Sequence, residues 1–132
     1  MSEVEIMEEF AIRGDRIWSV LQWWASVTFA VLLAAHVGAS SLNRVVVTIM
    51  LGIYSMFTVL IAQIILANFL AGAAVAAALR KVAETTTLSP IGQNVLDDDP
   101  TIRATTMVLV MVITFSATIF YAIYSYRKGR DI

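Results

Sequence analysis

The sequence predicts an all-α integral membrane protein: a single domain of three membrane-spanning helices, preceded by an amphipathic helix at the membrane interface. The first observation is composition. Of 132 residues, 59% are hydrophobic and 14% charged, whereas soluble domains have about 45–50% apolar and about 25% charged residues. A chain this short cannot bury so much apolar surface in a core of its own. The second observation is that residues 17–43, 45–79 and 104–126 carry no charge. Each stretch has at least the roughly 20 residues that a helix needs to cross a bilayer.

The N-terminal segment, residues 1–16, is polar and acidic. On a helical wheel its apolar and charged side chains fall on opposite arcs, and Glu9 and Arg13 are spaced as an i,i+4 ion pair. We therefore expect an interfacial helix here, with a bend at Gly14 before the first span. The acidic start and the lack of a clear cleavage site indicate that the first apolar segment is not a secretory signal.

The first span is predicted over residues 17–37, followed by a short polar turn that ends at Arg44. The second is predicted over residues 45–70. Its uncharged stretch is too long for one crossing, and its last third is mostly alanine, a strong helix former that is only weakly lipophilic. We therefore expect the helix to leave the membrane and continue to about residue 81.

Residues 82–99 are predicted to form a loop, in which the sequence from Ser89 to Gly92 is typical of a turn. Asp99 followed by Pro100 is a strong signal for the start of a helix. The third span is predicted over residues 104–126.

The orientation of the chain does not follow from its charges. Three spans place the N-terminus and the loop on one side, with five basic residues, and the first turn and the C-terminus on the other side, with four. The positive-inside rule needs a larger difference than this.

Polar residues inside the spans are the candidates for function, because no span carries a charge. Apart from Asn68, they lie along one stripe on each helix, where small and hydroxylated side chains favour helix packing. The alternative is a polar path through one chain or a ring of copies. The candidates for contacts between helices or between subunits are Gln22, Ser26, His36, Ser55, Gln63, Asn68, Thr114 and Thr118.

Gln63 is the most informative of these residues, because an unpaired amide at mid-span is costly in hydrocarbon. We expect it to bond to Gln22, Ser26 or Thr118 inside the bundle, or else to face a pore or a partner subunit. Asn68 lies on another side of the same helix. It is therefore expected either at the interface or against another chain.

Several kinds of chemistry are not expected. The chain has no cysteine and one histidine, His36, so a zinc or haem site that needs two such ligands cannot form within one chain. Neither a metal nor another cofactor is predicted. The three aspartates from Asp97 to Asp99 lack the alternating ligands of a calcium loop. Acid–base catalysis needs positioned titratable groups, and the acidic and basic side chains of this chain lie outside the charge-free stretches, so an enzyme is not expected. A net charge of −1 gives no reason to expect a nucleic-acid partner.

The function that these features favour is an accessory, assembly or self-associating subunit of a membrane complex. The alternative is a homo-oligomeric channel or pore, including a holin-like hole former. In size and number of spans the chain is similar to small anchor and accessory subunits of respiratory and photosynthetic complexes, although it lacks the mid-span histidines that such anchors use for haem. The expected partners are the lipid bilayer and either further copies or other membrane subunits. The expected location is a bacterial cytoplasmic membrane.

Overall fold

The computed structural model describes residues 2–98 and 100–130. In this part of the chain there are four helices and no strand: α1 (Glu3–Val37), α2 (Arg44–Thr85), α3 (Pro90–Asp97) and α4 (Pro100–Arg130). The helices α1, α2 and α4 are long and apolar enough to cross a membrane. The expected all-α membrane bundle with three spans is therefore confirmed.

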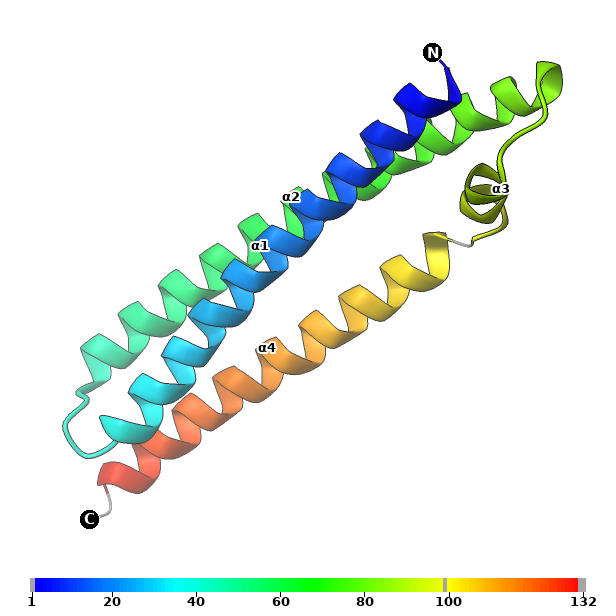
Figure 1. Cartoon of the computed structure of the whole chain (residues 1–132). Helices are drawn as coiled ribbons and strands as arrows, with labels where there is room; N and C mark the ends of the chain where they lie inside the picture. The colour runs from blue at the N-terminus through cyan, green and yellow to red at the C-terminus, as the bar shows by residue number, and fades with distance from the viewer. Residues whose placement is uncertain (1, 99, 131–132) are drawn as a thin grey trace.

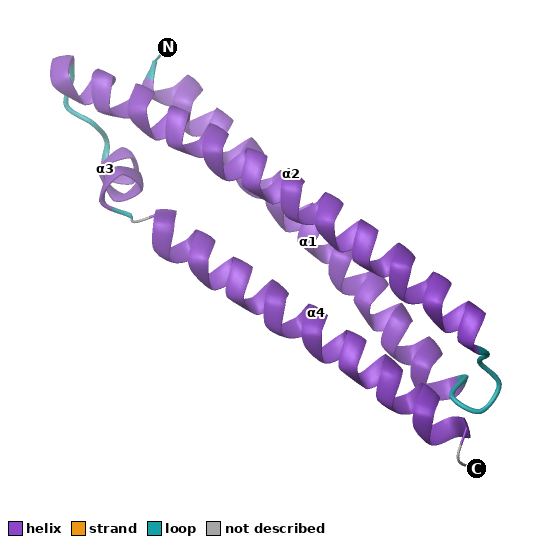
Figure 2. Cartoon of the chain, turned by 180° about the vertical axis from the view of Figure 1, so that it is seen from behind, coloured by secondary structure: helices purple, strands orange, loops and turns teal. Residues whose placement is uncertain are grey.

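The three long helices form an elongated bundle. α1 and α2 run antiparallel, side by side, and α4 runs in the same direction as α1 (Figure 1). α4 lies close to the other two near its C-terminus and diverges from them toward its start, where α3 is found (Figures 1 and 2). The N-terminus and α3 therefore share one end of the molecule, and the 38–43 turn and the C-terminus share the other.

Side-chain caps define where the helices begin. Ser2 and Glu5 form a reciprocal capping box at the start of α1. At the start of α2, the Asn43 side chain accepts a hydrogen bond of 2.8 Å from the backbone N–H of Val46. Such caps satisfy backbone donors that a helix leaves unpaired at its first turn.

The N-terminal segment is helical, as expected, but it is not a separate helix. α1 continues through Gly14 without a break, since a glycine inside a helix costs only about 1 kcal/mol. The apolar side of this segment packs on protein: Ile6 forms a buried cluster with Leu79 of α2 and with Leu88. The start of α1 therefore runs along the end of α2.

The region predicted as a loop contains α3. Ser89 caps this helix, its side chain accepting from the N–H of Gly92, and Pro90 occupies the first turn. Proline is tolerated there because that N–H has no partner within the helix. The Ser-Pro pair thus starts a helix where we expected a turn. α4 begins at Pro100, as expected; Asp99, its expected cap, lies outside the described residues.

The core has two parts. Trp24, Ile61, Ile65 and Met111 form a buried cluster between the three spans, and the Ile6 cluster lies toward the N-terminal end.

α2 has 42 residues and ends at Thr85, beyond the expected residue 81. At about 1.5 Å per residue it is roughly twice as long as a hydrocarbon core is thick. α2 is therefore longer than a single crossing requires.

Candidate functional site

The polar stripe of α4 faces the interior of the bundle. Thr118 is 1% exposed, and its hydroxyl donates a hydrogen bond of 2.8 Å to the carbonyl oxygen of Thr114 one turn earlier. Ser125, two turns further along the same stripe, is also buried. The hydroxyl groups of α4 are thus placed between helices, although Thr118 bonds within its own helix.

The polar stripe of α1 faces outward instead. Ser19, Gln22 and Ser26 are all exposed, and the Ser26 hydroxyl donates to the Gln22 carbonyl oxygen at 2.9 Å within the same helix. The buried face of α1 lies on the opposite side and includes Trp24 and Thr28. These three polar side chains therefore contribute nothing to the packing of the single chain.

The polar and small residues of α2 also point away from the bundle. We call this set the outer stripe of α2; its members are Thr48, Gly52, Ser55, Gln63, Ala67 and Ala74. All are exposed except Ser55, which is half-buried and donates to the Leu51 carbonyl oxygen at 2.7 Å. The opposite face, with Tyr54, Ile61 and Ile65, is the buried one. Close packing in α2 thus uses large side chains and leaves the small ones outside.

Gln63 is exposed in the middle of the outer stripe. Among the residues that the structure describes, its side chain has no hydrogen-bond partner. The structure does not bring it to Gln22, Ser26 or Thr118. Asn68 is half-buried, and its Nδ2 donates to the Ile64 carbonyl oxygen at 2.8 Å within α2. The Asn68 amide is therefore satisfied within its own helix, whereas the Gln63 amide is exposed on the outer stripe of α2.

Two hydrogen bonds that the sequence analysis did not anticipate connect α1 to α2. Trp24 Nε1 donates to Thr58 Oγ1 at 3.0 Å, and the hydroxyls of Thr28 and Tyr54 lie 2.8 Å apart. The available signal was the helical wheel, on which Trp24 and Thr28 share a face with Val31. An indole or phenol buried in a core usually bonds a polar group there.

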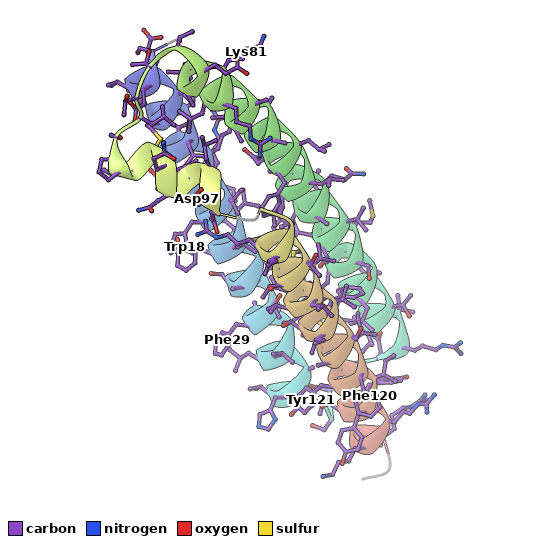
Figure 3. The ribbon with its side chains drawn as sticks, turned by 90° about the vertical axis from the view of Figure 1, so that its right-hand side faces the viewer. Trp18, Phe29, Lys81, Asp97, Phe120 and Tyr121 are labelled. Atoms are coloured by element: carbon purple, nitrogen blue, oxygen red, sulfur yellow. The ribbon has the colours of Figure 1, made fainter. Side chains whose placement is uncertain are left out.

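His36 connects α1 to α4. Its Nδ1 lies 2.7 Å from the Tyr121 hydroxyl, and the two rings are stacked with centroids 6.4 Å apart. Figure 3 shows Tyr121 beside Phe120 near the C-terminal end of the bundle. Among the described residues, no group of three or more acidic, histidine or cysteine side chains is arranged to hold a metal ion. His36 is thus a structural contact between helices in this fold.

The two outward stripes match in depth along the bundle. The Trp24–Thr58 hydrogen bond sets the register of the antiparallel pair. Ser19 precedes Trp24 by as many positions as Gln63 follows Thr58. Because the two helices are antiparallel, Ser19 and Gln63 lie at the same level along the bundle. By the Thr28–Tyr54 contact, Ser26 and Ser55 lie at nearly one level as well.

No model of a known protein family matches this chain, and neither a curated protein nor a solved structure matches it.

Proposed function

We propose that this protein is a self-associating subunit of a membrane assembly. In that assembly the outer stripe of α2 in one copy packs against the Ser19, Gln22 and Ser26 stripe of α1 in the next. The observation that carries the proposal is Gln63, an exposed amide on a span, at the depth of the polar stripe on α1.

The energetics favour covering Gln63. A side-chain amide exposed to hydrocarbon without a hydrogen bond costs on the order of 2–7 kcal/mol. A hydrogen bond between membrane helices recovers about 0.6–2 kcal/mol. Small neighbours allow another helix to come close: a Cβ built on Gly52 meets no atom within 4 Å. An interface on this stripe therefore combines close approach with a partner for the amide.

The matching depths of the two stripes favour a second copy of this chain as the partner that covers the outer stripe of α2. Copies related by rotation about the membrane normal keep every residue at its own depth, so Gln63 of one copy meets Ser19 and Gln22 of the next. Because α1 and α2 pack through faces opposite to their stripes, the two stripes of one chain point away from each other. A head-to-tail contact of this kind closes into a ring when the rotation allows. A two-fold contact between α2 helices leaves Gln22 uncovered.

A homo-oligomeric channel is the second candidate, since the same uncharged stripes are able to line water. Ion selectivity is normally built from carbonyl oxygens or charged rings, and the uncharged stretches of this chain supply no charged ring. We therefore expect no ion flux in liposomes that contain the protein. An ion flux that is lost in the Gln63→Leu variant would contradict the assembly function and support the channel instead.

Disulfide cross-linking tests the interface directly, because the natural chain has no cysteine. Two differently tagged chains, one with Ser26→Cys and the other with Ser55→Cys, are produced in the same membrane. We expect mixed dimers on oxidation, and few dimers when either variant is produced alone. Ala25→Cys with Ile113→Cys is the control pair, since both positions are exposed, and Ala25 lies off the face of α1 that carries Gln22 and Ser26. Cross-linking no stronger than in the control pair would contradict the interface.

A further inference from the structure

A cavity of about 310 Å³ lies where α4 diverges from α1 and α2. Residues of all four helices and of the segment after α3 line it. Its walls are mainly apolar and aromatic, and include Phe10, Trp18, Leu21, Phe69, Leu96 and Met107. Trp18 projects from α1 near the end of α3 that carries Asp97 (Figure 3). The volume is within the range of about 300–1,000 Å³ that is usual for small-molecule sites.

We infer that this cavity binds a long-chain fatty acid, with the carboxylate at Arg80 and the hydrocarbon chain along the apolar walls toward Leu21 and Met107. The site is separate from the proposed interface, because no residue of the outer stripe of α2 lines the cavity. The inference therefore does not depend on self-association.

The charges of the lining residues favour an anionic head group. Arg80, Arg103 and Asp98 are the charged lining residues. Asp98 already neutralises Arg103, with Nη2 and Oδ2 2.8 Å apart, whereas Arg80 has no ion pair among the residues that the structure describes. An arginine next to apolar walls is a strong, charge-assisted donor for a carboxylate.

The position of the cavity along the bundle favours an amphiphile that enters from the bilayer. Leu21 and Met107 belong to the charge-free stretches of α1 and α4, while Arg80 follows the charge-free stretch of α2. The cavity thus leads from the lipid-exposed part of the bundle to a cation beyond it. A single acyl chain follows this path, and the volume does not suit two chains with a large head group.

Binding of tritiated palmitate to the full-length protein in a non-ionic detergent tests the inference. We expect saturable binding of one palmitate per chain. Hexadecanol has the same chain without the charge, and it should compete about tenfold less well than unlabelled palmitate, the usual magnitude for one charge-assisted contact. An anionic phosphatidylglycerol is the third competitor, and it should also compete more weakly than palmitate.

Substitutions that fill the cavity or remove its charge give the structural test. Gly72 lines the cavity, and a Cβ built there meets no atom within 4 Å, so Gly72→Leu fills the space without displacing a neighbour. We expect it to weaken palmitate binding at least about tenfold by steric exclusion. Ala73→Leu is the matched control, since Ala73 is exposed on the same helix outside the cavity, and it should leave binding unchanged. Arg80→Gln should weaken palmitate binding and leave hexadecanol binding unchanged.

The opposite results would overturn the inference. These are no saturable binding, equal loss with Gly72→Leu and Ala73→Leu, equal competition by hexadecanol, or unchanged palmitate affinity in Arg80→Gln. Stronger competition by phosphatidylglycerol than by palmitate would replace the fatty acid by a phospholipid.

Discussion

The hydroxyl groups of Thr28 and Tyr54 lie 2.8 Å apart, buried between α1 and α2. Thr28 has one hydroxyl hydrogen and donates it to the Trp24 carbonyl oxygen at 2.8 Å. Tyr54 is therefore the donor in the contact between the helices. This bond, together with Trp24–Thr58, sets the register that puts the two outward stripes at matching depth.

Tyr54→Phe removes this donor and keeps the ring, which packs against Phe115 with centroids 5.4 Å apart. We expect a loss of unfolding free energy of about 0.6–1.7 kcal/mol, the range for hydrogen bonds between membrane helices. Unfolding in sodium dodecyl sulfate measures it. Thr28→Val and the double variant complete a cycle, in which fully additive losses would show that the two hydroxyls do not interact.

Gly129→Ala should loosen the end of α4. A Cβ at Gly129 would collide with the backbone carbonyl of Ala39 in the turn between α1 and α2. Because a backbone atom cannot move aside cheaply, we expect a loss of about 1–3 kcal/mol, measured by the same unfolding assay.

Gly14→Ala is the matched control for that change. The space at Gly14 is open, and the residue lies inside α1. Here alanine should stabilise the helix by about 0.5–1 kcal/mol. Equal effects of the two substitutions would argue against the close contact at Ala39.

Leu79→Ala should destabilise the end of the bundle that carries α3. Leu79 is fully buried against Ile6 and Leu88, and such truncations in a core cost about 2–5 kcal/mol. Hydrogen exchange should rise in α3 and at the start of α1, but not around Trp24. Leu66→Ala, at an exposed position of the same helix, should change exchange little; a similar rise there would mean that burial is not the cause.

The spans and the fold class were predictable because charge is excluded from hydrocarbon, so the charge-free stretches mark the three long helices. Helix α3 was not predicted, since Ser-Pro is common both to turns and to helix starts. Whether Ser-Pro begins a turn or a helix depends on the contacts of the residues around it. Here Gly92 lies against Glu3, and the Ser89 hydroxyl and N–H both donate to the Glu3 carboxylate. Because Glu3 is distant from these residues in the sequence, a local pattern does not reveal this contact.

The orientation of the polar stripes was predictable only in part. A helical wheel groups Gln63 with Ser55 and Tyr54 with Ile61, but it does not say which group turns inward. In water the apolar face must be buried, whereas in lipid both faces are compatible with the solvent. α4 turns its Thr118 face inward, while α1 and α2 bury Trp24 and Tyr54, whose large side chains fill the space between the helices.

The measurement that tests the central claim most directly is the mass of the protein extracted with its native lipids, compared between the natural chain and Gln63→Leu. Gln93→Leu, on the exposed surface of α3, is the control for the same change outside the spans. We predict a particle that contains only copies of this chain, a shift to single chains in Gln63→Leu with helix content unchanged, and no shift in Gln93→Leu. A natural chain that is extracted singly, or whose extra mass comes from other proteins, would contradict self-association through the outer stripe of α2.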